Sequence, residues 1–426
     1  MKLSQKQAII LVASVVIVIV IVVVVILNVR PHGTAATVGK LAVWGIEDKK
    51  TFDPIIANYP YATVSYTQMD PANYDAQVLS ALAAGTGPDV FEIGDHALPR
   101  WQSALSPLPA SLASQYGALW ISQTFPDVVT QDFVSGGKLY GLPLSIDTLA
   151  LFYNKDLFNS AGIATPPKTW DDFEADVVRL RAVNAQGELS QAGAAIGGSE
   201  ASIANAPDML SLLMLQNGTQ MMNSEGTAAA FAGGSGGSGL SAFNFYLQFA
   251  NAASPYYTWN DSMGSDADSF AAGSAAMMFG YQSDLATIES KAPFLNVGIA
   301  PMPQPAGATI AVNYPSYEGF AAAKAGQTAT AWNFILYLTA SNANEKLYLT
   351  ATGKPPANRT EIQADESNPQ LSVFAGQALT AKSWPEPNDV QVSAIFNSAI
   401  LNVLNGSDDS TAALNQAQSA VDALIQ

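Results

Sequence analysis

The chain has 426 residues, of which 49% are hydrophobic and 12% are charged, and its formal net charge is −17. This composition excludes a disordered or coiled-coil chain, and the length predicts two or more domains. The acidity makes nucleic acid a poor partner, because neutralising phosphates requires a basic face. The absence of cysteine excludes disulfides, thiolate metal sites and a lipid-modified N-terminal cysteine.

The N-terminal segment predicts a membrane anchor. Residues 8–27 are apolar except for a single serine, and two lysines precede them. About 20 residues span a bilayer, whereas the apolar region of a signal peptide has about 7–15. We therefore expect an uncleaved signal-anchor helix over residues 1–30 and a linker over 31–39, with the body of the protein outside the cytoplasmic membrane. Small residues after the apolar run leave a cleaved signal peptide as the alternative.

The body of the chain begins with a pattern typical of an α/β sheet. Apolar alternation predicts strands over 40–44, 63–69 and 89–93, and helical periodicity predicts helices over 49–58 and 73–84. Strands that alternate with helices in this way are typical of sheets with crossover connections.

The stretch LPLSIDTLALFYNKDLF, Leu142–Phe158, predicts a buried strand that is interrupted by the polar residues Asp147 and Thr148. Further on, Thr169 and Asp172 form a pattern typical of a capping box at the start of a helix.

The rest of the chain is predicted to be mainly helical between residues 200 and 290 and to return to strands beyond 290. We expect it to end in helices over 328–350, 390–404 and 410–425.

Motifs of catalysis and metal binding are incomplete. The segment GGSGG, residues 233–237, matches the G-x-S-x-G pattern of hydrolases, but it lacks the preceding strand and a triad histidine. No G-K-[ST] of a phosphate-binding loop occurs, and the acidic loop at 261–268 lacks the spacing of an EF-hand. We expect no metal, no cofactor and no catalytic residue. The many acids leave a glycoside hydrolase as a weaker alternative.

Several aromatic residues stand beside polar ones near predicted strand ends or loops. Aromatic faces stack on the apolar faces of sugars, while neighbouring polar groups bind hydroxyls. For each aromatic taken singly, packing in the core remains the alternative. The aromatic residues and their polar neighbours are Trp44 with Glu47, Tyr281 with Gln282, Tyr317 with Glu318, and Trp259.

Five segments, in the same order, resemble the extracellular solute-binding protein family of ABC importers, the group that includes maltose-binding-like proteins. The strongest is GKLYGLPLSIDTLALFYNKDLFNSAGIATPPKTWDDF, residues 137–173, which is close to the family pattern G-K-x-Y-G-x-P…YNKDLF…P-P-x-T-W-[DE]-[DE]-F. The others are GTGPDVFEI, FAAGSAAMMFG, VGIAPMPQP and the stretch WNFILYLTASNANEKLYLTATGKPPAN. The resemblance extends over residues 40–426.

This resemblance implies an α/β fold of two discontinuous lobes joined by a hinge, with the ligand in the cleft between them. It implies a first lobe over 40–145 and 294–340, and a second over 146–293 and 341–426. Carried over position by position, it implies ligand contacts at Trp44, Glu47, Asp95, Asp147, Thr148, Asn205, Trp259, Tyr281, Gln282, Tyr314, Tyr317 and Glu318.

The resemblance also implies a function. It describes a carrier that binds a carbohydrate and delivers it to an ABC permease and its ATPase, on the outer face of the cytoplasmic membrane. The implied contacts include no Arg or Lys, which disfavours a phosphorylated solute, but their acids leave a polyamine as an alternative. A glycoside hydrolase and an adhesin-like surface module are alternatives from other classes.

Two departures from the family pattern affect these expectations. Many members carry a tryptophan after the last glycine of F-x-x-G-x-A-A-M-x-x-x-G, where this chain has GYQSD, so we expect Tyr281 to take its stacking role. Many are anchored by a lipidated cysteine, and we expect the N-terminal helix to replace that anchor.

Overall fold

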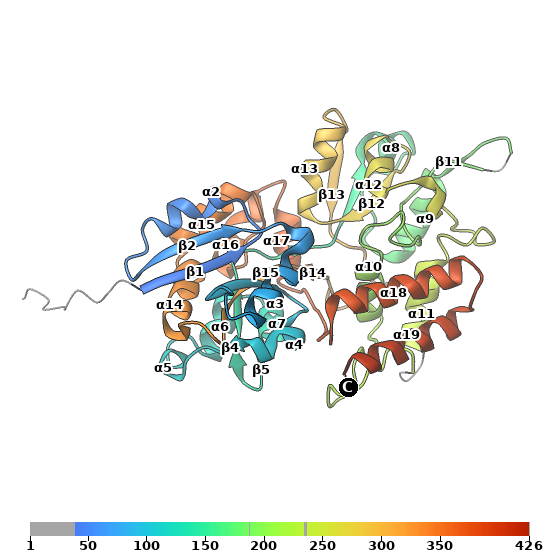
Figure 1. The fold of residues 1–426 in the computed structure, drawn as a ribbon. Helices are drawn as coiled ribbons and strands as arrows, with labels where there is room; N and C mark the ends of the chain where they lie inside the picture. Colours follow the sequence, from blue (N-terminus) through green and yellow to red (C-terminus); the bar gives the residue numbers. More distant parts are fainter. Residues whose placement is uncertain (1–38, 187, 234–236, 426) are drawn as a thin grey trace, which may run out of the picture.

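The computed structural model describes residues 39–186, 188–233 and 237–425. Two lobes stand side by side, and each has its own hydrophobic core (Figure 1). The blue start of the chain and the orange segments lie together in one lobe, and the green, yellow and red segments form the other. The predicted two-lobed α/β fold with discontinuous lobes is confirmed.

The first lobe is built on a sheet in the order β2-β1-β3-β15-β4, with β7 paired to β15. β1 runs parallel to β2 and β3, while β15 runs antiparallel to β3. The ends of β1 and β3 and the start of β15 therefore meet at one edge of the sheet. The strands are β1 (Gly39–Gly45), β2 (Ala62–Gln68), β3 (Val90–Gly94), β4 (Leu105–Ser106), β7 (Gly141–Pro143) and β15 (Glu318–Ala323).

Helices and one short ribbon complete the first lobe. The single helix predicted over 328–350 is in fact two, because the chain breaks at Ser341, whose side chain accepts a hydrogen bond from Asn344 N and caps the second helix. The helices are α2 (Lys49–Ile56), α3 (Tyr74–Ala83), α4 (Leu98–Trp101), α5 (Ala110–Ala113), α6 (Ala118–Thr124), α7 (Asp127–Phe133), α14 (Thr328–Thr339), α15 (Asn342–Thr352) and α16 (Arg359–Ala364), and the ribbon pairs β5 (Val134–Ser135) with β6 (Lys138–Leu139).

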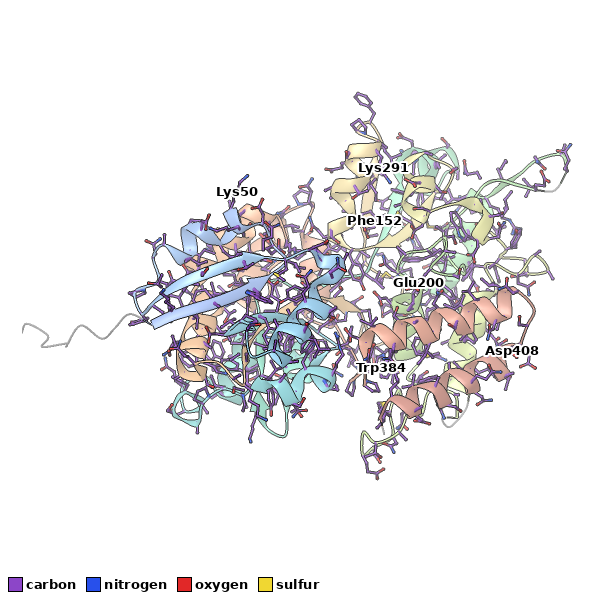
Figure 2. All side chains as sticks on the ribbon, in the orientation of Figure 1. Lys50, Phe152, Glu200, Lys291, Trp384 and Asp408 are labelled. Carbon is purple, nitrogen blue, oxygen red and sulfur yellow. The ribbon has the colours of Figure 1, made fainter. Side chains whose placement is uncertain are left out.

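The second lobe has a three-stranded antiparallel sheet, in which β9 (Ala150–Asn154) lies between β12 (Met277–Gly280) and β13 (Val297–Ala300). Figure 2 shows Phe152 of β9 inside this lobe, where its side chain is fully buried. Its helices are α8 (Lys155–Ser160), α9 (Trp170–Leu180), α10 (Ala206–Gln216), α11 (Ser238–Leu247), α12 (Asp266–Ala271), α13 (Gln282–Lys291), α18 (Asp389–Leu404) and α19 (Ser410–Ile425), and a hairpin joins β10 (Ala182–Val183) to β11 (Leu189–Gln191).

The capping box predicted at the start of α9 is confirmed. Thr169 Oγ1 accepts a hydrogen bond from Asp172 N, and Asp172 Oδ2 accepts one from Thr169 N. These two bonds satisfy main-chain amides that the first turn of a helix leaves without a partner. Phe173, Val177 and Leu180 follow on the buried face of the helix.

Three segments cross between the lobes and form the hinge. β8 (Asp147–Thr148) pairs antiparallel with β14 (Pro315–Ser316), and Asn313 forms a bridge with Ala381 beside them. α17 (Ser372–Ala378) packs against β8, and its Gln377 donates to Thr148 Oγ1 at 3.1 Å and to Leu149 O at 2.9 Å. The buried strand predicted within 142–158 is thus β7, β8 and β9, which continue from one lobe through the hinge into the other, and Asn154 then caps α8.

The two cores divide the chain differently from the predicted ranges. We expected 294–340 in the first lobe, but residues 297–314 pack in the core of the second. We expected 341–426 in the second, but residues 341–381 pack mainly in the core of the first. The predicted ranges also cross the hinge three times, but the second crossing lies at β14 and the third after α17, and no change in sequence pattern marks either position.

The predicted membrane anchor and most of the linker lie outside the described residues. In the part of the chain that the structure does describe, no helix is both long and apolar enough to span a bilayer.

Candidate functional site

A pocket of about 490 Å³ lies between the lobes, and we call it the inter-lobe pocket. Figure 2 shows Glu200 on the side of the second lobe, above α18, and Trp384 beside the start of that helix. Both lobes and the hinge supply its polar lining, which includes His96, Glu200, Asp208, Tyr314, Glu386 and Asp389. A second pocket of about 460 Å³ adjoins it, because Asp389 and Val390 line both.

The first lobe contributes Asp95 and His96, which directly follow β3. The main chain fixes this turn, because Asp95 N donates to Tyr317 O at 2.9 Å. The Asp95 carboxylate is buried, and its Oδ2 lies 3.2 Å from His96 Nε2. His96 stacks on Tyr314 with 5.2 Å between the ring centroids. Burial lowers the pKa of His96 to about 4, so the imidazole is neutral near pH 7.

Asp132 of α7 connects this turn to the hinge. Its carboxylate accepts hydrogen bonds from the hydroxyls of Tyr317, at 2.5 Å, and of Ser383, which lies in the third crossing segment. Burial raises the pKa of Asp132 to about 7, and the two hydrogen bonds limit the rise. The charge of Asp132, after burial itself, also raises the pKa of Asp95.

The opposite wall of the inter-lobe pocket carries two further carboxylates. Asp208, in the first turn of α10, accepts a hydrogen bond from Tyr281 Oη at 2.7 Å. Glu386 accepts one from Tyr314 Oη at 3.3 Å. Burial raises the pKa of Asp208 to about 6, and burial followed by the charge of Asp208 raises the pKa of Glu386 well above its usual value.

The adjoining pocket is acidic as well. Glu92 and Glu318 line it at the sheet edge, and burial raises the pKa of Glu92 to about 8. Glu47, from the loop after β1, forms an ion pair with Lys354. Lys354 therefore neutralises part of the charge at this edge, and burial is the main cause that raises the pKa of Glu318.

Some of the predicted contacts lie at these pockets. Tyr314 lines the inter-lobe pocket and Glu318 lines the adjoining one. Tyr281 is one hydrogen bond away from the inter-lobe pocket, through Asp208. Asp95 contacts the lining residue His96, and its main-chain amide is bonded to Tyr317. Because they come from different parts of the chain, these residues meet only in the folded protein.

Three other predicted contacts form part of the hinge. Asp147 Oδ1 accepts hydrogen bonds from Thr148 N at 2.8 Å and from Gln282 N at 3.0 Å, and Asp147 Oδ2 accepts one from Ser283 N at 3.2 Å. Asp147 thus caps the N-terminus of α13 from the hinge strand. Thr148 is fully buried, and its hydroxyl donates to Phe374 O. The structure therefore places the polar interruption of this strand in the hinge and not at the pocket.

The three remaining predicted ligand contacts lie outside both pockets. Trp259 is fully buried in the core of the second lobe, where its Nε1 donates to Ser202 Oγ at 3.0 Å. Asn205 precedes α10 and hydrogen-bonds Asp284. Trp44 is half-buried on β1 and packs against the core of the first lobe. None of the three lines either pocket.

Sequence reasoning missed most of the pocket's polar lining. Two features of the sequence could have indicated these residues. Asp208 follows a proline at the start of an apolar helix, and Glu386 lies between two prolines in the segment WPEPND. An acid in such a context is more often functional than one on a solvated helix face. The residues missed are His96, Glu200, Asp208, Glu386 and Asp389.

The arrangement of polar groups in the inter-lobe pocket is suited to binding a polar ligand. Carboxylates, hydroxyls and a neutral imidazole converge on the pocket and can accept hydrogen bonds from a polar ligand. In residues 39–186, 188–233 and 237–425, no group of three or more His, Asp or Glu side chains is placed to hold a metal ion.

The chain is similar to known binding proteins. The family model of the bacterial extracellular solute-binding protein matches residues 44–345. A protein of Brucella abortus (strain 2308), named as a binding protein without a stated ligand, is 26% identical over 394 residues, which are 89% of each chain. The maltodextrin-binding protein MdxE of Bacillus subtilis (strain 168) is 26% identical over 309 residues, or 70% of each chain.

A solved structure shows the same fold. The sugar-binding protein MalE of Xanthomonas citri superposes with a TM-score of 0.74 over 91% of this chain and 97% of its own, at 19% identity.

Proposed function

Because the chain belongs to the bacterial extracellular solute-binding protein family, we propose that it binds a carbohydrate between its lobes and delivers it to an ABC importer. The inter-lobe pocket is the observation that carries this proposal. A ligand that contacts both walls binds the closed arrangement better than an open one, so it shifts the population towards closure. The bound state can then be recognised by a membrane permease.

The polar lining of the pocket supports a sugar ligand. His96 on one wall, and Asp208 and Glu386 on the other, supply acceptors for sugar hydroxyls. Among the relatives, the Bacillus subtilis protein is named for maltodextrin and the Xanthomonas citri protein for sugar. The same chemistry is proposed here.

The proposal assigns the remaining predicted contacts to two regions. Glu318 lines the adjoining pocket at the edge of the first sheet, where an extended sugar would continue from the inter-lobe pocket, and Glu47 and Trp44 lie nearby at the end of β1. Asp147 and Thr148 act at the hinge, where they set the relative position of the lobes.

The partners and location follow from the family. We propose a separate permease, driven by a separate ATPase, and no catalytic activity in this chain. Residues 1–30 would anchor the protein to the outer face of the cytoplasmic membrane, because the apolar run over 8–27 is long enough to span it.

Thermal unfolding of the purified full-length protein against neutral sugars, amino sugars, polyamines and amino acids tests the proposal. A ligand at about 100 times its Kd adds about 2.7 kcal/mol to the free energy of unfolding, which raises the midpoint measurably. A shift with a sugar supports the proposal. If only a polyamine or an amino acid shifts the midpoint, the carbohydrate function is wrong, and turnover of a sugar would contradict the absence of catalysis.

A further inference from the structure

The charge of the inter-lobe pocket is one-sided. Its lining contains four carboxylates, from Glu200, Asp208, Glu386 and Asp389, and neither Lys nor Arg. Asp389 is ion-paired with Arg100, from the adjoining pocket, with 3.0 Å between Oδ1 and Nε. The pocket lining is therefore acidic, with one Arg from the adjoining pocket paired to one of its four carboxyl groups.

The other three carboxylates are held by hydroxyl groups alone. Asp208 accepts a hydrogen bond from Tyr281 and Glu386 accepts one from Tyr314. Glu200, which is exposed, accepts one from Ser393 Oγ at 3.1 Å. Within the described residues, no Lys or Arg lies within ion-pair distance of any of the three. Hydroxyl donors orient these carboxylates but leave their charge uncompensated.

The buried carboxylate of Asp95 is a separate observation, because it lacks a well-aligned hydrogen-bond donor. Only 6% of the residue is exposed, and the nearest nitrogen to its Oδ2 is His96 Nε2 at 3.2 Å, which does not form a well-aligned hydrogen bond with it. The neighbouring His96 is neutral, so it brings no positive charge to this carboxylate. A buried carboxylate oxygen without a well-aligned donor is costly, and a positive charge in the neighbouring pocket would lower that cost.

These carboxylates also act on one another. Burial is the largest cause of the raised pKa of Asp95, and the charges of Asp132, Asp208, Glu318 and Glu386 add to it. A sugar hydroxyl can donate to a carboxylate but does not reduce this repulsion. An ammonium group donates up to three hydrogen bonds and also brings a positive charge among the carboxylates.

We propose that the inter-lobe pocket selects an amino sugar, whose ammonium group lies beside Asp208 and Glu386, over a neutral sugar of the same size. This inference rests on the proposed carbohydrate function and specifies its ligand class. The hydroxyls of Ser211 and Ser393 in the same lining face the remaining polar groups of the sugar. Selection arises because charge-assisted hydrogen bonds are about twice as strong as neutral ones.

Titration calorimetry on the full-length protein near neutral pH tests the inference with matched ligands. The first set is glucosamine, galactosamine and mannosamine against glucose, galactose and mannose. The second is the β-1,4-linked glucosamine disaccharide against its N-acetylated form and against cellobiose, with spermidine as a polyamine. We expect at least one aminated sugar to bind about tenfold more tightly than its neutral counterpart, with an affinity that falls as salt is added.

Two failures can be told apart. If neutral sugars bind as tightly as their aminated counterparts, the inference is wrong and the carbohydrate function stands. If spermidine binds and no sugar does, both are wrong. Failure of every aminated sugar to bind also overturns the inference.

Two isosteric variants test where the charge is recognised. Asp208→Asn and Glu386→Gln keep the size of each side chain and remove its charge. Each is expected to reduce the preference for the aminated sugar by about fivefold or more, while the affinity for the neutral counterpart changes less. Glu225→Gln removes a charge from an exposed residue that is not part of the pocket lining and is the matched control. An unchanged preference in both pocket variants would refute the assignment of the ammonium site, and a thermal melt of each variant checks its folding.

Discussion

An ion pair joins the two lobes outside the hinge. Arg100 of α4 contacts Asp389, the first residue of α18, through Nε at 3.0 Å and through a terminal guanidinium nitrogen at 3.2 Å. The same guanidinium pairs with Asp75 of the first lobe at 2.7 Å. Because α18 packs in the second lobe, this pair favours the arrangement in which the lobes are close. We predict that Asp389→Asn opens the unliganded protein.

The expected loss of free energy depends on how exposed the two side chains of the ion pair are. The side chains of Arg100 and Asp389 are 21% and 25% exposed. An exposed pair is worth about 0.2–1 kcal/mol, whereas breaking a fully buried one costs about 3–5 kcal/mol. Since Arg100 keeps its bond to Asp75, we expect a loss of about 1–2 kcal/mol, which is a factor of about 5–30 in the ratio of closed to open molecules.

Fluorescence energy transfer between the lobes measures that ratio. The chain has no cysteine, so Lys50→Cys and Lys291→Cys place one dye on each lobe, at exposed sites that Figure 2 labels. Asp127→Asn is the control, because it removes an ion pair to Arg359 within the first lobe. The unliganded Asp389→Asn protein should show lower transfer than the wild type, and the control should not. Identical transfer in all three proteins would refute the role of the pair.

Three further predictions concern stability. Burial raises the pKa of Glu345 to about 8, whereas its pKa in the unfolded chain is near 4.5. Between these two pH values the folded state binds more protons than the unfolded state. The free energy of unfolding therefore falls as the pH rises through this window. Glu345→Gln should therefore flatten the fall in melting temperature from pH 5 to pH 8, and an unchanged slope would contradict the assignment. Trp332→Ala should cost about 3–5 kcal/mol in urea unfolding, because the side chain is fully buried in the first core; a loss below about 1 kcal/mol would mean that it packs loosely. Gly298→Ala should cost about 1–3 kcal/mol, because its Cβ would lie 2.2 Å from the ring of Tyr153, and a neutral result would show that the ring moves aside.

The local elements were largely predictable from the sequence. The strands β1, β2 and β3, the capping box of α9 and the C-terminal helices α18 and α19 lie within a residue or two of the predicted ranges. Each depends on signals that are local in the chain, namely apolar periodicity and the side chains that cap helix ends. The break between α14 and α15 was missed although the polar stretch SNANEK, which begins at Ser341, is typical of a helix start.

The two-lobed arrangement was predicted from motif order, but not the course of the chain through the hinge. The third crossing, Ala381–Trp384, is held by contacts with Asn313 and with Asp132. These partners are far away in the sequence, so no local sequence pattern predicts the contacts with them. Asp147 shows the same limitation, because its use as a cap for α13 depends on a helix that begins more than a hundred residues later.

The sequence by itself determined the fold class, the order of most elements and the absence of thiol chemistry, because these depend on composition and on short-range patterns. Only the tertiary structure decided which acids share a pocket. His96, Asp208, and the pair Glu386 and Asp389 come from three separate segments and converge where the two lobes meet. Their burial and mutual repulsion exist only once the lobes are placed, and so does the one-sided charge that points to a cationic sugar.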